Sequence, residues 1–215
     1  NHMQVVELSG KKDHRERLLH KMQNYFVINQ GDDQKAHENN ILADLYKRFH
    51  LKENPGNIEV LDREISYLAV HEKSIAFDFN ELCLGPRSHF DYIEMAKQFN
   101  TIILMNVPEL GGEMRERIKA RGTEDGSMGS GSTGERHVML APMDDGARRF
   151  IALIDELYDQ QVALFLICYV PLKKLYTHGS LAFQFERARS RLIEMGSEEY
   201  MSKVHDNNRA YESRT

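Results

Sequence analysis

Two almost wholly apolar segments, each ended by a proline, restrict the folds that this chain can adopt. Residues 101–107 run into Pro108, and residues 162–170 run into Pro171. Strands that are apolar on both faces lie in sheets whose two faces are both covered, and such sheets are mostly parallel. Amphipathic helical patterns alternate with these strands, at residues 88–99, 144–158 and 185–195. The sequence therefore predicts an α/β fold with a mostly parallel sheet and helices on both faces.

A different pattern precedes this part of the chain. Residues 58–79 read as short strands with turns at 62–63 and 71–73, which predicts an antiparallel β-meander. Upstream, residues 32–49 carry apolar side chains at helical spacing, and Asn54-Pro55-Gly56-Asn57 is expected to stop that helix in a turn. Further elements are expected closer to the N-terminus: strands at residues 3–8 and 25–28, and a short helix or turn at 13–19.

The helix predicted at residues 88–99 has a recognisable start. Ser88 is a favourable N-cap residue, and Asp91 stands three residues later, in the position of a capping box. The helical period predicts an apolar face to which a lysine contributes its aliphatic stem. The residues of this face are Phe90, Ile93, Ala96, Lys97 and Phe99.

Charge and composition exclude several classes of protein. Lys and Arg number 28 against 33 Asp and Glu, a net charge of −5, so no overall positive field favours nucleic acid. The longest apolar run, residues 162–170, is too short to span a bilayer, and the first residues have no signal-peptide pattern. Two cysteines without a CxxC pair argue against a disulfide scaffold, and scattered histidines argue against a metal site.

The sequence contains no complete catalytic motif. The phosphate-binding pattern GxxxxGKS/T is absent, and Gly131-Ser132-Thr133-Gly134 lacks both its lysine and its preceding strand. Ser180 with a histidine would suggest a hydrolase, but no GxSxG supports this over an ordinary loop serine. Asn106 stands at a strand end where a Walker B motif has acidic residues, and a structural strand end is the better interpretation. No catalytic residue is predicted.

Three arginines are candidates for contact with a nucleotide: Arg87 is the first choice, followed by Arg149 and Arg187. Arg87 lies in a Gly-Pro-Arg-Ser turn, Arg149 lies near the start of the next helix, and Arg187 lies on the last helix. An arginine at a loop–helix junction can reach a phosphate and complete a nucleotide site. The competing interpretation is that these side chains are solvated or ion-paired, with Arg187, Arg191 and Glu194 forming a ladder along one helix.

Several long segments of the chain occur in the order found in a known protein family. They are Phe77-Asp78-Phe79-x-Glu81-Leu82-Cys83-x-Gly85-Pro86-Arg87-Ser88-x-x-Asp91-Tyr92, residues 147–159, Val170-Pro171-Leu172 with Leu175-Tyr176, Phe183-x-Phe185-Glu186-Arg187, and residues 190–200. In these segments the chain resembles the ZapE-type, AFG1-like family of cell-division ATPases, which are P-loop proteins of the AAA+ type. The resemblance runs from about Val5 to His205.

The resemblance implies that this chain is the C-terminal half of such an ATPase. The Walker A, Walker B, sensor asparagine and arginine finger of the family lie upstream of the Val5-Val6 strand, so the fragment is expected to be inactive alone. ATP and Mg²⁺ are expected in the full-length protein, and no bound cofactor is expected in the fragment. The family implies ATP hydrolysis in the cytoplasm, peripherally at the bacterial division ring, with division-ring proteins and homo-oligomers as partners; a mitochondrial location is the alternative for a eukaryotic relative.

The patterns and the resemblance together divide the chain. Residues 1–30 are predicted to be the end of the ATPase core, residues 31–57 a helical connector, and residues 58–201 the C-terminal α/β region. This region carries an inserted Gly/Ser-rich loop at about 111–142, flexible at its centre, and a frayed tail follows at 202–215. The fragment is then a scaffold with nucleotide-sensing arginines. The alternative is a non-catalytic α/β interaction module that docks partner proteins, and an independent enzyme of another class is a third, less supported reading.

Overall fold

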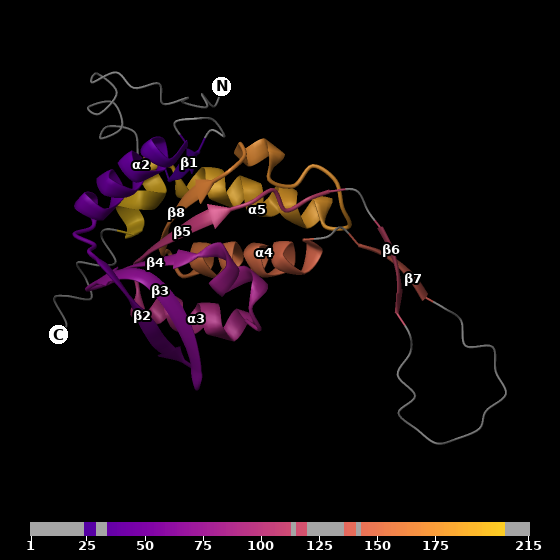
Figure 1. The fold of residues 1–215 in the computed structure, drawn as a ribbon, viewed down its shortest axis with the longest axis horizontal. Helices are drawn as coiled ribbons and strands as arrows, with labels where there is room; N and C mark the ends of the chain where they lie inside the picture. The colour runs from indigo at the N-terminus through magenta and orange to yellow at the C-terminus, as the bar shows by residue number, and fades with distance from the viewer. Residues whose placement is uncertain (1–23, 29–33, 113–114, 120–135, 141–142, 205–215) are drawn as a thin grey trace.

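The computed structural model describes residues 24–28, 34–112, 115–119, 136–140 and 143–204 (Figure 1). The strand predicted at residues 3–8 and the helix or turn predicted at 13–19 lie outside the described residues.

One six-stranded sheet forms the centre of the protein. Its strands are β1 (Tyr25–Val27), β2 (Glu53–Val60), β3 (Arg63–His71), β4 (Ser74–Asp78), β5 (Thr101–Val107) and β8 (Ala163–Cys168). They lie in the order β1-β8-β5-β4-β3-β2. The first four of these are mutually parallel, whereas β4, β3 and β2 pair antiparallel. The mostly parallel sheet and the antiparallel meander predicted from the sequence are both confirmed.

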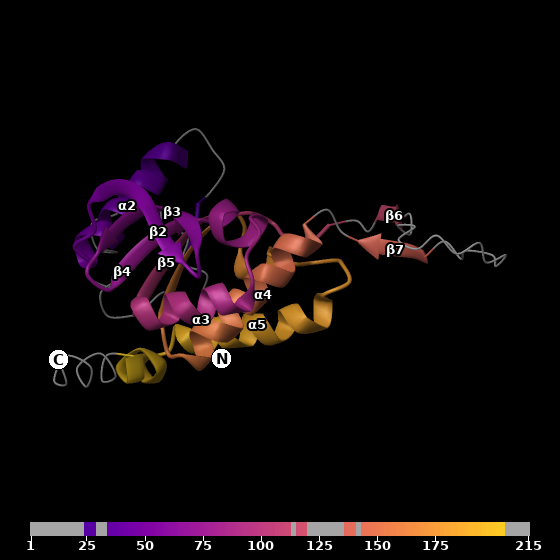
Figure 2. The same ribbon diagram turned by 90° about the horizontal axis from the view of Figure 1, so that it is seen from below.

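Helices cover both faces of this sheet, as expected. They are α2 (Gln34–Arg48), α3 (His89–Gln98), α4 (Asp144–Asp159) and α5 (Ala182–Met195), with a π-helix η1 (Asn80–Leu84) and a 3₁₀ turn η2 (Leu172–Lys174). Figure 2 shows α2 on one side of the sheet and α3, α4 and α5 on the other.

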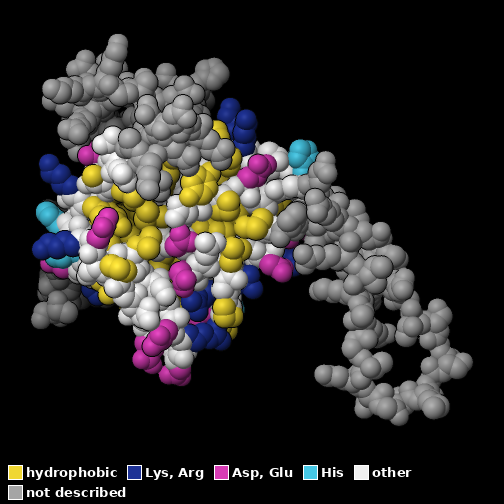
Figure 3. All heavy atoms as spheres, in the orientation of Figure 1, with side chains coloured by type: hydrophobic (Ala, Val, Ile, Leu, Met, Phe, Trp, Pro, Cys, Tyr) yellow, Lys and Arg dark blue, Asp and Glu magenta, His cyan; other side chains and the backbone are white. Residues whose placement is uncertain are grey.

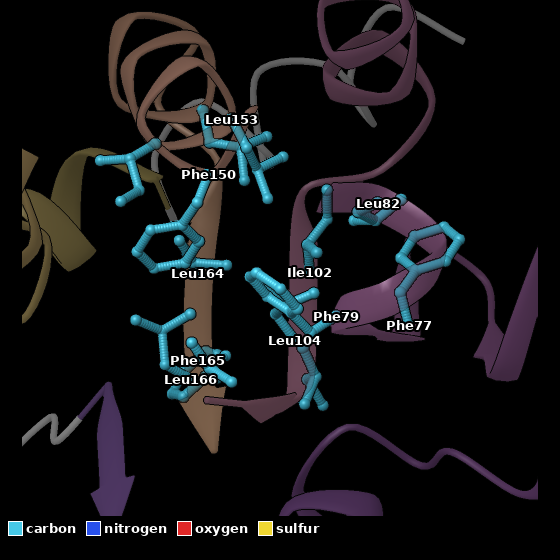
Figure 4. Packing of buried hydrophobic residues seen from close by; sticks show 14 of the residues in the cluster. Phe77, Phe79, Leu82, Ile102, Leu104, Phe150, Leu153, Leu164, Phe165 and Leu166 are labelled. Atoms are coloured by element: carbon cyan, nitrogen blue, oxygen red, sulfur yellow. The ribbon is translucent and has the colours of Figure 1, made fainter. Parts of the chain in front are cut away.

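Neighbouring residues of β8 show how the two layers are held. The Phe165 ring contacts the Phe49 ring just after α2, with centroids 4.9 Å apart. Leu164 points to the opposite face, where Phe150 and Leu153 of α4 pack over it (Figure 4). Adjacent strand residues alternate between faces, so a strand that is apolar throughout can serve two helical layers at once. Phe150, Leu153, Leu164 and Phe165 are all essentially buried.

The turn predicted at residues 54–57 is wrong. These residues belong to β2, and the pairing with β3 shifts in register between Glu53 and Gly56. Because β2 is an edge strand, Pro55 can lack an N–H without costing the sheet a hydrogen bond. The chain instead leaves α2 at His50, whose φ of 53° places it in the left-handed region.

The N-cap of α3 is confirmed, but the predicted apolar face is only partly so. Phe99 is buried and Ala96 packs against the core, whereas Phe90 is 59% exposed and the side chains at the centre of the buried face are Tyr92 and Met95. The buried Asp91 carboxylate binds Arg63 of β3, with Oδ2 and Nη1 3.1 Å apart. This contact joins the buried face of α3 to β3, and periodicity within one helix contains no information about such a partner.

The insertion predicted at residues 111–142 contains a two-stranded ribbon. β6 (Arg115–Lys119) pairs antiparallel with β7 (Arg136–Leu140), and both extend away from the sheet in Figures 1 and 2. The centre of the insertion lies outside the described residues. At the root, the backbone N–H groups of Leu110 and Gly111 donate to Leu175 O, and that of Gly112 donates to His178 O. A side chain at Gly111 would lie 2.8 Å from backbone atoms of residues 177 and 178, which explains the glycine.

The C-terminal end of the described chain is helical from residue 198 to 204, and Val204 is buried. The rest of the tail predicted to fray lies outside the described residues. Among the helices that the structure describes, none combines the length and the hydropathy needed to cross a membrane.

Candidate functional site at the carboxyl ends of the parallel strands

Polar side chains follow three neighbouring parallel strands where each one ends. Asp78 ends β4, Asn106 is the penultimate residue of β5, and Tyr169 follows β8. The Tyr169 hydroxyl donates to Asn106 Oδ1 at 2.7 Å, and Asn106 Nδ2 donates to Asp78 Oδ2 at 2.6 Å. Ligands of open α/β sheets bind outside the carboxyl ends of the strands, so this is the edge where a site is expected.

The backbone of β5 turns Asn106 into this network. Its φ is 59°, in the left-handed region that asparagine tolerates better than most residues. The pairing of β5 with β8 shifts between Leu104 and Val107, which adds a residue at the same point. The interpretation of Asn106 as a structural strand end agrees with this geometry, because its amide oxygen and nitrogen both bond to protein groups.

A second cluster ties the loop after β8 to the first turn of α4. Asp144 is only 1% exposed and accepts hydrogen bonds from the Tyr176 hydroxyl at 2.7 Å and the Ser180 hydroxyl at 2.8 Å. Burial, followed by the hydrogen bond to Asp144, raises the pKa of Tyr176 to about 12. The Ser180 hydroxyl thus donates a hydrogen bond to a buried carboxylate, which supports the interpretation of Ser180 as an ordinary loop serine.

Arg87 is held inside the protein by backbone groups. Its Nε donates to Glu81 O at 2.9 Å, and its Nη2 donates to Glu64 O at 3.3 Å. The Glu81 carboxylate lies 3.7 Å from Nη2, and the Arg87 side chain is 8% exposed. These contacts join η1 to β3. They use the guanidinium donors that a nucleotide phosphate would need.

Arg149 reaches the same π-helix from α4. Its Nη1 donates to Cys83 O at 3.3 Å and to Asp145 O at 3.4 Å. Both bonds are long, and Arg149 forms no ion pair with any residue that the structure describes. Of the three candidate arginines, Arg149 therefore keeps the most free donor capacity.

Arg187 lies on a separate surface, between α5 and α4. It forms an ion pair with Asp155, and Arg191 binds the same carboxylate at 2.8 Å and Asp159 at 3.3 Å. The predicted ladder is therefore real as an ion-pair network, but its acceptors come from α4 and not from Glu194. Helical spacing along α5 could not reveal partners on another helix.

The sequence interpretation missed Asp78 and Tyr169, which together with Asn106 form what we call the polar edge, and it missed Asp144 and Tyr176 of the second cluster. A signal was available for three of these, because Asp78 and Tyr169 lie at the ends of predicted strands and Asp144 starts a predicted helix; Tyr176 lies in a loop and had no such signal. In the part of the chain that the structure describes, no three His, Cys, Asp or Glu side chains gather closely enough to hold a metal ion.

Comparisons with known proteins agree with the resemblance drawn from the sequence. A family model described as AFG1-like ATPase matches residues 1–121 and 135–204. Cell division protein ZapE of Escherichia coli K12 is 34% identical over 154 residues, which cover 72% of this chain and 33% of the relative. Lactation elevated protein 1 homolog B of Danio rerio is 28% identical over 199 residues, 93% of this chain and 34% of the relative. The chain thus spans about a third of the length of these relatives. No solved structure matches it.

Proposed function

The chain belongs to the AFG1-like ATPase family, and from this premise we propose that it is the non-catalytic C-terminal part of a cell-division ATPase. The observation that carries the proposal is that the side chains of the polar edge hydrogen-bond to one another. Asp78, Asn106 and Tyr169 satisfy one another where an open α/β sheet would bind a ligand. The sequence also lacks the lysine-bearing loop that positions a triphosphate.

We place the chemistry in the whole protein. There, ATP and Mg²⁺ would bind to Walker motifs carried by another part of the polypeptide, and hydrolysis would serve the division ring from the cytoplasm. Division-ring proteins and further copies of the same protein are the proposed partners. The present chain would then act as a scaffold, with the interaction-module reading as its alternative.

Phosphate release tests the non-catalytic role directly. The 215-residue chain incubated with ATP and Mg²⁺ is expected to release no phosphate above the buffer rate, because positioning of the triphosphate supplies most of the catalysis of phosphoryl transfer. Release that rises with protein concentration and disappears in Asp78→Asn would show that the polar edge is an active site.

Arg149 is the arginine that we propose to sense nucleotide in the whole protein. Arg149→Ala, made in the protein that carries the Walker motifs, is expected to lower ATP turnover about tenfold or more, since a cation at the phosphates stabilises transition-state charge. Unfolding of the variant should stay within about 0.5 kcal/mol of the parent, because its present hydrogen bonds are long.

Arg87→Ala is the matched comparison. It removes the hydrogen bonds to the Glu81 and Glu64 backbone oxygens. The free energy of unfolding is therefore expected to fall by about 1–3 kcal/mol, whether or not turnover changes. Unchanged turnover in Arg149→Ala, with normal folding, would remove Arg149 as a sensor and leave Arg187 as the remaining candidate.

A further inference from the structure

A group of basic side chains lies at the amino ends of the parallel strands, on the edge opposite the polar site. α2 ends there, and β3 turns into β4 beside it. We call this group the basic edge, and its members, all exposed, are Lys47, Arg48, His50, Lys52, His71 and Lys73. Figure 3 shows Lys, Arg and His side chains gathered where α2 ends, on the left of the view.

Two contacts join the segments that make up the basic edge. The His50 and His71 rings have centroids 6.1 Å apart, which brings the end of α2 to the end of β3. The Lys73 carbonyl accepts the backbone N–H groups of Asn100 and Thr101, which fixes the β3–β4 turn beside the start of β5. The edge is therefore a single surface built from three parts of the sequence.

Most other cations of the described structure lie near a carboxylate, whereas the Lys and Arg side chains of the basic edge have no carboxylate within ion-pair distance among the described residues. Arg63, Arg87, Lys97, Arg148, Arg187, Arg189, Arg191 and Lys203 all lie within ion-pair distance of a carboxylate. Lys47, Arg48, Lys52 and Lys73 form no such pair with any described residue. Among the described residues, the ionic contact at this edge is that of His71 with Glu72 at 3.8 Å, and it depends on a protonated histidine.

Arg48 is the most specific feature of this surface. Its guanidinium carbon lies 5.3 Å from the centroids of both the Phe49 and the Phe165 rings. Partial burial lowers the pKa of Arg48, as expected for a cation that loses water without gaining a carboxylate. Stacking on aromatic faces leaves the in-plane N–H donors of a guanidinium available for a bidentate carboxylate.

The helix dipole explains only part of the arrangement. Lys47 and Arg48 lie in the last turn of α2, where cations are favourable. Lys52 and Lys73 lie beyond the helix, in the connection to β2 and in the β3–β4 turn, so the dipole gives no reason for them. A chain with a net charge of −5 nevertheless keeps all four cations together.

We propose that the basic edge docks an acidic peptide segment of a partner protein, with one carboxylate bound by Arg48. The half-buried Phe49 beside Arg48 offers a small apolar contact for the same segment. A narrow ligand fits better than a membrane or a nucleic acid, because the exposed Glu53 and Glu72 flank the cations and would repel an extended anionic surface. This inference goes beyond the proposed function and does not depend on ATP hydrolysis.

The experiment measures anisotropy of a fluorescein-labelled hexaglutamate peptide titrated with the full 215-residue chain. Saturable binding that weakens with added salt is expected. The double variant Arg48→Glu/Lys73→Glu should bind at least about tenfold more weakly, since two attractive contacts become repulsive. Arg48→Lys keeps the charge but loses the planar fork, so an intermediate loss is expected.

Lys173→Glu/Lys174→Glu is the matched control. It makes the same change of net charge at η2, on two lysines that also form no ion pair with a described residue, and should change the affinity less than about twofold. Equal losses in the two double variants would show a net-charge effect and overturn the proposal. So would absence of peptide binding, or binding only to vesicles of phosphatidylserine and phosphatidylcholine, which would assign the edge to a membrane. Circular dichroism of each variant confirms that it is folded.

Discussion

Replacing Asp91 with alanine is expected to lower the free energy of unfolding by about 3–4 kcal/mol, the largest single-residue effect foreseen outside the apolar core. The carboxylate is buried, and its Oδ2 accepts from the Ser88 backbone N–H at 2.6 Å, the Ser88 hydroxyl at 3.0 Å and Arg63 at 3.1 Å. Alanine removes the carboxylate half of the capping box of α3 and the contact that joins α3 to β3. Urea unfolding followed by circular dichroism measures the loss.

Asp91→Asn should cost clearly less than Asp91→Ala. The amide oxygen can still accept from Ser88, and the other carboxylate oxygen, Oδ1, is buried without a hydrogen-bond partner among the described residues. Burying a neutral amide in that position costs less free energy than burying a carboxylate oxygen that has no hydrogen-bond partner. Glu94→Ala, which removes only an exposed pair with Lys97, serves as the control and should cost less than about 0.5 kcal/mol. A loss of that small size in Asp91→Ala would contradict the role given to Asp91.

Asn106→Asp should destabilise the protein by about 2–3 kcal/mol at neutral pH, because it places a second carboxylate against Asp78 in place of an amide donor. Two adjacent carboxylates hold a proton more tightly than either does in the unfolded chain. The folded variant therefore binds more protons than the unfolded one, so its stability falls as pH rises and the deficit shrinks on acidification. Urea unfolding of parent and variant at mildly acidic and neutral pH measures this difference.

The exchanged pair Asp78→Asn/Asn106→Asp supplies the control. It restores one amide and one carboxylate, and the hydroxyl of Tyr169 can still donate to residue 106. Most of the stability should return, with the pH dependence removed. If the exchanged variant is no more stable than Asn106→Asp, the contact between residues 78 and 106 is not the cause of the loss.

The sequence was sufficient for the architecture because the core strands are apolar on both faces. A covered, mostly parallel sheet buries residues 101–107 and 162–170 on both of their faces, and the apolar stripe of α4 packs on one of those faces. The sequence predictions failed where contacts between segments far apart in the sequence determine the structure. Pro55 lies in a strand because β2 has an open edge, and the buried face of α3 includes Asp91, whose partner Arg63 lies 28 positions earlier.

The candidate site was harder to predict for the same reason. Arg87 precedes a helix in the sequence, yet its acceptors include Glu64 O, which lies 23 positions earlier in β3 and comes near only when the segment after β4 packs beside β3. Whether Arg87, Arg149 or Arg187 contacts nucleotide stays a prediction. In the sequence, Asn106 stands out because a Walker B motif would have a carboxylate at that position. Its hydrogen bonds to Asp78 and Tyr169 depend on the order of the strands, which the sequence alone does not give.

The anchoring of the β6–β7 ribbon has a mechanical consequence. Three backbone hydrogen bonds join residues 110–112 to the loop at 175–178. The same loop carries Tyr176, whose hydroxyl donates a hydrogen bond to Asp144. Residues just before the ribbon and the first turn of α4 just after it are therefore held by one loop. A change in the position of that loop would shift both ends of the insertion together, and Gly111 leaves no room for a side chain at this junction.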